Sequence, residues 1–151
     1  MTKIDLEKIV QFIISESVNL KNKYTKEINA KVEYCDIFSQ DGEEYQRLTE
    51  IVNECGKIAH SGPTGNIYSL TEPIKTVAGD LYFLKIRKPD NKLRFRGDAD
   101  FDTNYQKLKQ KHLNNPNFEL IIREKFEMLR LSDPDFDVMT CFSNIPVRKW
   151  V

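Results

Sequence analysis

Four basic side chains occupy alternate positions on either side of a four-residue turn. Lys85 and Arg87 precede the turn formers of Pro89–Lys92, and Arg94 and Arg96 follow them. If the flanking segments pair as a β-hairpin, Arg87 lies opposite Arg94 and Lys85 lies opposite Arg96. Side chains alternate between the two faces of a strand, so all four cations would share one face. Like charges that face each other across a strand pair are destabilising, so this arrangement calls for a negatively charged neighbour.

The chemistry of these cations favours a binding module for a phosphate-bearing ligand, of which RNA is one example. Guanidinium groups present forked donors that match phosphate oxygens. Phosphate contacts also dominate the affinity of proteins for nucleic acids. Two other interpretations stay open. The carboxylates of Asp98, Asp100 and Asp102 can fold back and neutralise the cations, or the hairpin can belong to a protein-interaction domain that docks on an acidic partner.

A second group of reactive side chains lies in the turn-rich segment 59–66. His60 is followed by the hydroxyl groups of Ser61 and Thr64, and the neighbouring glycines allow close approach of a ligand. A histidine can act as general acid or base near neutral pH. The alternative hypothesis is therefore a small metal-independent nuclease or phosphoryl-transfer enzyme, with His60 as the catalytic residue and the same cations stabilising the transition state. His60 can also be a loop residue whose ring caps local backbone groups.

Asp98, Asp100 and Asp102 stand at alternate positions, which on an extended segment would place their carboxylates on one face. Such a row can hold a divalent cation, yet the segment lacks the glycine and the final glutamate of a calcium loop. Capping of a helix by Asp102 and neutralisation of the arginines explain the acidic residues more simply. With only two histidines, a three-histidine zinc site is excluded. We expect no metal site and no cofactor.

The composition narrows the class of protein without naming a function. The 151 residues carry 23 basic and 23 acidic side chains, so any surface for a polyanion must be local. Three separated cysteines suggest neither a disulfide framework nor a zinc ribbon, and they fit a reducing compartment. The first residues include acidic side chains, and no apolar run is long enough for a membrane helix. We therefore expect an unprocessed cytoplasmic protein that does not associate with a membrane.

The periodicity of apolar residues predicts helices in the first part of the chain. Thr2 and Asp5 resemble a capping box for a first helix that ends near Asn22. Asp41 can cap a second helix, which Gly56 would end in a left-handed conformation. Irregular backbone is expected to follow this helix.

Strands account for most of the remaining chain. Alternation and β-forming residues predict strands at residues 30–38, 67–70, 74–77, 81–88, 93–95, 118–122, 126–131 and 136–142. Residues 118–129 also fit a helix, because Phe118, Ile122, Phe126 and Leu129 would share one helical face. Asp102 is expected to cap a short third helix between the fifth and sixth of these strands. Neither an internal repeat nor a linker divides the chain. The sequence thus predicts one α+β domain over residues 1–151, with N-terminal helices packed on a mainly antiparallel β-sheet.

Overall fold

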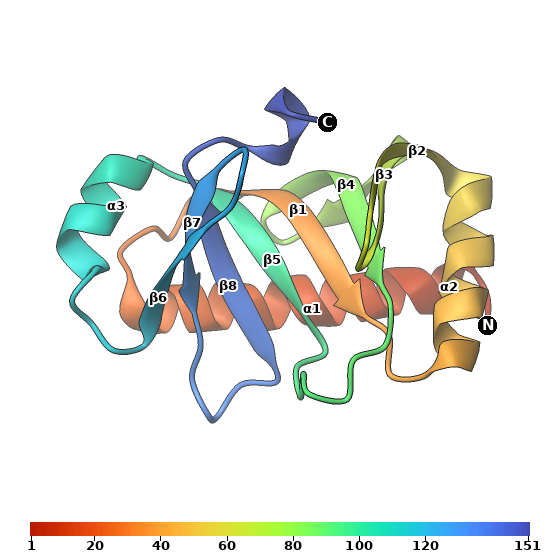
Figure 1. Ribbon diagram of the computed structural model, residues 1–151, viewed down its shortest axis with the longest axis horizontal. Helices are drawn as coiled ribbons and strands as arrows, with labels where there is room; N and C mark the ends of the chain where they lie inside the picture. The colour runs from red at the N-terminus through yellow and green to blue at the C-terminus, as the bar shows by residue number, and fades with distance from the viewer.

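In the computed structural model, which describes residues 1–151, an eight-stranded sheet forms the centre of the molecule (Figure 1). The strands lie in the order β2-β3-β4-β1-β5-β8-β7-β6. Their bounds are β1 Lys31–Phe38, β2 Gly56–Gly62, β3 Gly65–Thr76, β4 Gly79–Arg87, β5 Gly97–Asp102, β6 Phe118–Ile122, β7 Glu127–Leu131 and β8 Val138–Ser143. The β1–β4 and β5–β8 pairs are parallel and the other five pairs are antiparallel, which confirms the predicted α+β class.

Three helices pack on this sheet (Figure 1). Their bounds are α1 Lys3–Tyr24, α2 Gly42–Cys55 and α3 Tyr105–His112. The backbone N–H of Thr2 donates to Asp5 Oδ2 at 2.6 Å, and Asp41 Oδ1 accepts from the N–H of Glu44 at 2.8 Å. Both predicted helix starts are therefore confirmed. No helix is both long enough and apolar enough to cross a membrane.

The two halves of the chain repeat one pattern of elements. The first half runs β1-α2-β2-β3-β4 and the second runs β5-α3-β6-β7-β8. In each half the first strand lies parallel to the last, and the middle strands continue the sheet outward to its edge. The halves meet at the antiparallel β1–β5 pair. The sequence showed no repeat because only the pattern of strand pairing recurs, whereas the residues that fill it differ.

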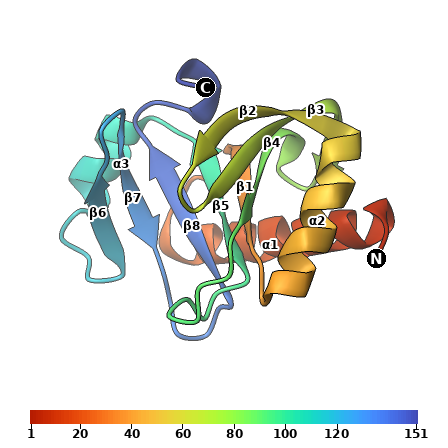
Figure 2. The ribbon, with the colours of Figure 1, turned by 45° about the vertical axis from the view of Figure 1, so that its right-hand side comes forward.

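The central strands carry apolar side chains on one face of the sheet and charged side chains on the other. Side chains of β1, β4 and β5 that face α1 are fully buried in the core, namely Cys35, Ile37, Leu84, Ile86, Ala99 and Phe101. The alternate positions of these strands, among them Asp36, Lys85 and Asp98, point to the other side, because successive side chains of a strand face opposite ways. Figure 2 shows the β2–β3 hairpin on this second side, with α1 behind the sheet. The charged face therefore lies away from α1.

The predicted hairpin of residues 81–96 does not form. Residues 88–96 contain no strand, and β4 pairs instead with β3 and in parallel with β1. The backbone of Arg96 bridges two other segments, because its N–H donates to Asp137 O at 2.6 Å and its carbonyl accepts from the N–H of Phe38 at 2.9 Å. β4 pairs with β1 rather than with segment 93–95 because β1 extends the apolar face beneath α1, and this short segment cannot.

Three local predictions also need correction. Gly56 is extended, with φ of −167°, and it begins β2, so the expected irregular segment 59–66 is largely a β-hairpin. Gly65 follows the turn at φ +144°, and a Cβ there would lie 2.1 Å from Ile86 O, so this position requires glycine. Asp102 ends β5, and Asn104 caps α3 by accepting from the N–H of Lys107 at 3.2 Å. The strands predicted for residues 118–142 are confirmed within two residues at each end.

Candidate functional site

A cavity of about 460 Å³ opens on the side of the sheet away from α1. Its walls come from β1, β4, β5, β7 and β8, from the β2–β3 turn and from the C-terminal segment. We call it the sheet cavity. Eight aspartate, histidine, lysine and arginine side chains line it, namely Asp36, His60, Lys85, Arg87, Asp98, Asp100, Arg123 and Arg130.

Carboxyl groups occupy the middle of the sheet cavity. The strand register places Asp36 of β1 opposite Asp98 of β5, and it places Lys85 of β4 beside Asp36. Asp36 is only 4% exposed, and its Oδ1 atom has no hydrogen-bond partner. Asp100 is better satisfied, because it accepts from both the backbone N–H and the hydroxyl of Ser143. The floor of the cavity therefore holds one buried carboxylate oxygen that no protein group satisfies.

Burial controls the protonation of these carboxyl groups. It raises the pKa of Asp36 well above its ordinary value, and the facing carboxylate of Asp98 adds to the rise. Burial also raises the pKa of Asp98 to about 6, although the nearby charge of Lys85 opposes the shift. The pKa of Asp100 rises to about 7, again mainly through burial. Asp98 and Asp100 therefore change protonation nearer to neutral pH than ordinary carboxylates do.

The cations of the sheet cavity are largely without acidic partners. Lys85 Nζ donates to Thr64 Oγ1 at 2.6 Å, but Lys85, Arg87 and Arg123 form no ion pair. The guanidinium of Arg87 lies 5.3 Å from the centre of the Phe38 ring. Positive and negative side chains thus line one cavity without neutralising each other. Asp36 is buried and Lys85 and Arg87 are half-buried, whereas Arg123 is exposed; unpaired charges at low exposure are costly unless a ligand meets them, so the arrangement is typical of a binding site.

Aromatic side chains form another wall of the sheet cavity. The Trp150 ring stacks on Phe126 at 5.4 Å between centroids and meets the edge of His60 at 5.2 Å. A short 3-10 helix, η1 (Val147–Lys149), precedes Trp150, and an ion pair between Arg148 and Glu33 ties this segment to β1. In Figure 1 the C-terminal segment stands beyond the ends of the central strands. The C-terminus therefore links the two outer hairpins of the sheet through its tryptophan.

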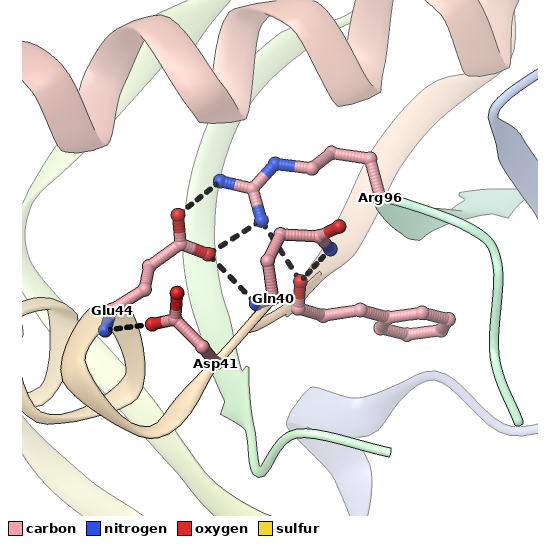
Figure 3. A network of polar contacts seen from close by, with 5 residues as sticks. Gln40, Asp41, Glu44 and Arg96 are labelled. Atoms are coloured by element: carbon pink, nitrogen blue, oxygen red, sulfur yellow. Dashed lines mark hydrogen bonds and ion pairs between the residues drawn. The ribbon is translucent and has the colours of Figure 1, made fainter. Parts of the chain in front are cut away.

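The other two predicted cations, Arg94 and Arg96, lie outside the sheet cavity. Arg96 forms a bidentate pair with Glu44, at 2.7 Å and 3.1 Å, and it also donates to Phe38 O at 2.9 Å (Figure 3). Arg94 donates to the carbonyl oxygens of Phe136 at 3.0 Å and of Asp133 at 3.4 Å. The predicted face of four converging cations is therefore wrong, since the hairpin that would have built it is absent.

The predicted site residues fall into two groups. The first group lines the sheet cavity together, and its members are His60, Thr64, Lys85 and Arg87. The second group does not line it, and its members are Ser61 on β2 and the two arginines of segment 88–96. The sequence reasoning missed Asp36, Arg123 and Trp150. Asp36, which stands between Cys35 and Ile37 in the predicted strand, was the available signal, because a charge buried in a sheet needs a functional or structural partner.

The aspartate row behaves as predicted only in part. Asp98 and Asp100 share the cavity face of β5, whereas Asp102 is exposed at its end. Across the chain, no group of three or more histidine, cysteine, aspartate or glutamate side chains is arranged to hold a metal ion. The three cysteines are free.

Comparisons with known proteins bear on the fold alone. No family model and no curated protein matches the sequence. A solved structure described as "Structural Genomics, Protein EC4020" superimposes with a TM-score of 0.71 at 11% identity, over 94% of this chain and 86% of that one. A glyoxalase/bleomycin resistance protein/dioxygenase superfamily member from Vibrio splendidus 12B01 gives a TM-score of 0.41 at 13% identity, over 76% of this chain and 97% of that one. The first likeness shows a shared fold.

Proposed function

We propose that this protein binds a small phosphate-bearing molecule in the sheet cavity. Arg87 and Arg123 are the groups that would receive the phosphate, and Lys85, whose ammonium group donates to the hydroxyl of Thr64, lines the same cavity. The observation that carries the proposal is that these three cations line one cavity and form no ion pair. Two arginines and a lysine suit phosphate because guanidinium groups offer two parallel donors to its oxygens.

The shape of the site favours a small molecule over an RNA strand. A volume of about 460 Å³ lies in the range of small-ligand sites. Apolar side chains make up much of the lining, including Phe126 and Trp150, so the ligand would place a carbon skeleton there. A polynucleotide would need an open cationic track, whereas Arg94 and Arg96 are already bound by protein groups.

The direct test uses inorganic phosphate and 15N-labelled protein at low ionic strength. We expect amide shifts to change around Thr64, Lys85 and Arg87, and we expect these changes to vanish in the Lys85→Gln/Arg87→Gln double variant. The matched control is Arg94→Gln, which alters a cation outside the cavity and should leave the shifts intact. Shifts that map to Arg94, or no shifts at any phosphate concentration, would contradict the proposal.

A second candidate function is an enzyme that moves a proton on the bound ligand. The pKa of Asp98 at about 6 and of Asp100 at about 7 suit general acid–base catalysis near neutral pH. The sequence hypothesis gave this role to His60, which lines the same cavity and packs against Trp150. Both assignments stay proposals.

Proton exchange separates the two catalytic assignments. Ribose 5-phosphate is incubated with the protein in D2O, and deuterium at the carbon next to its aldehyde is measured by NMR. Loss of exchange in Asp98→Asn with retention in His60→Ala supports the carboxyl mechanism. The reverse result supports the histidine, and no exchange in the unmodified protein counts against acid–base catalysis of this substrate.

A further inference from the structure

The least satisfied polar atom in the sheet cavity is Asp36 Oδ1. Asp36 is 4% exposed, lines the cavity and has no donor for this oxygen. Lys85 is its neighbour in the strand register, yet the ammonium group donates to Thr64 and no ion pair joins it to Asp36. A buried carboxylate oxygen without a donor is costly, so this is a position where a ligand would place a hydrogen-bond donor.

A phosphate group cannot serve as that donor. Phosphate oxygens are acceptors that carry negative charge, and the carboxyl groups of Asp36 and Asp98 face each other across the β1–β5 pair. The phosphate therefore belongs at Arg87, which is two residues further along β4 than the Lys85 beside Asp36, and at Arg123, which follows β6. A different part of the same molecule must meet the carboxyl groups.

Hydroxyl groups match these carboxyl groups better than an ammonium group does. Burial raises the pKa of both Asp36 and Asp98, so the facing pair retains a proton more readily than exposed carboxylates do. A pair that holds one proton offers both a donor and acceptors. A hydroxyl both donates and accepts, whereas an ammonium group only donates, and Lys85 already brings one ammonium to this row.

We propose that the ligand is a phosphate ester of a polyhydroxylated carbon chain, as in a sugar phosphate. Its phosphate lies at Arg87 and Arg123, and its hydroxyl groups bond to Asp36 and Asp98. This assignment rests on the proposed function, because it takes the phosphate site as given and names the chemistry of the rest of the ligand in the same cavity.

Three five-carbon probes test the assignment by calorimetry at pH 7. Ribose 5-phosphate carries hydroxyl groups, pentyl phosphate carries none, and 5-aminopentyl phosphate carries one ammonium group. We expect ribose 5-phosphate to bind at least tenfold more tightly than either of the others. Asp36→Asn should remove this advantage while leaving the affinity for pentyl phosphate unchanged. Asp102→Asn alters an exposed carboxylate at the end of β5, the strand of Asp98, and should change neither affinity.

The possible failures can be told apart. If pentyl phosphate or 5-aminopentyl phosphate binds as tightly as ribose 5-phosphate, the hydroxyl assignment is overturned and phosphate binding stands. An advantage of ribose 5-phosphate that survives in Asp36→Asn also overturns the role given to Asp36. If none of the probes binds and inorganic phosphate produces no shifts, the proposed function fails together with this inference.

Discussion

Two pairs of basic residues, close in sequence, meet different surroundings in this molecule. Lys85 and Arg87 extend from β4 into the sheet cavity, where neither forms an ion pair. Arg94 and Arg96 lie in the irregular segment after β4, and both are bound by protein groups, Arg96 through the network of Figure 3. The difference teaches that a cation is a candidate for ligand binding when the fold leaves it without a partner, whatever its spacing in the sequence.

The energetic roles of the two regions should differ accordingly. Arg96 binds the carboxylate of Glu44, which is N-terminal in α2, and the carbonyl of Phe38, which ends β1. It therefore holds together parts of the fold that are distant in sequence. In the sheet cavity Lys85 bonds only to the hydroxyl of Thr64 and Arg87 forms no ion pair, so these half-buried charges should reduce stability until a ligand arrives.

The largest expected effect is a loss of stability with rising pH caused by the sheet cavity. The folded protein keeps protons on Asp98 and Asp100 that the unfolded chain has released, because the folded pKa values are about 6 and 7. The free energy of unfolding should therefore fall between about pH 4 and pH 7 and level off above, by up to about 7 kcal/mol. Urea unfolding at a series of pH values measures this change.

The matched variant for the urea unfolding series is Asp98→Asn/Asp100→Asn. Its free energy of unfolding should fall much less as the pH rises. Burial lowers the pKa of His112, and this group acts in the opposite direction near pH 6, because its unfolded form takes up the proton. The difference between the variant and the unmodified protein gives the contribution of the two carboxyl groups to the pH dependence of the free energy of unfolding. Equal pH dependence in both proteins would show that the carboxyl groups titrate normally.

Removal of the partnered cation should give the next largest effect. Arg96→Met keeps the aliphatic length but loses the bidentate pair with Glu44, whose side chain is 19% exposed, as is that of Arg96. We expect a loss of about 2 kcal/mol in the free energy of unfolding by urea. Arg47→Met breaks the exposed pair with Glu43 one turn along α2 and should cost about 0.5 kcal/mol or less. Equal losses in the two variants would remove the distinction drawn for Arg96.

Removal of an unpartnered cation should change protonation more than stability. Lys85 is the charge that most opposes the rise in the pKa of Asp98, so Lys85→Met should raise that pKa above about 6. Carboxyl 13C shifts followed through a pH titration measure the change. Lys75→Met, on the exposed end of β3, is the control and should leave the Asp98 titration where it is.

Much of the fold was predictable because local patterns and tertiary packing agree. The caps at Thr2 and Asp41 depend on residues three positions away, and the last three strands are short runs rich in apolar residues. The pairing of β4 was not predictable from turn chemistry alone. Its parallel neighbour β1 lies some 50 residues earlier. The free energy gained by burying both strands beneath α1 therefore cannot be inferred from residues adjacent in the sequence.

Part of the candidate site was predicted from the sequence. His60, Thr64, Lys85 and Arg87 were chosen for their chemistry, and they do line one cavity. Their neighbours Asp36 and Trp150 come from distant segments that only the fold brings together. The sequence also could not show which cations have partners, because Glu44 reaches Arg96 across 52 positions.

The smallest expected effect concerns the aromatic wall of the sheet cavity. Trp150→Ala should weaken the binding of pentyl phosphate about threefold, because one apolar surface of the cavity is lost while the phosphate contacts remain. Calorimetric titration of both proteins measures the change. A loss as large as that caused by removing a cation would mean that stacking, rather than phosphate contact, dominates the affinity.

The most direct test compares Arg87→Gln with Arg94→Gln in the binding of pentyl phosphate. Trp150 is the only tryptophan and lines the sheet cavity, so its fluorescence reports the titration. We predict that Arg87→Gln raises the dissociation constant about tenfold or more and that Arg94→Gln leaves it unchanged. Equal weakening in both variants, or weakening in Arg94→Gln alone, would contradict the account.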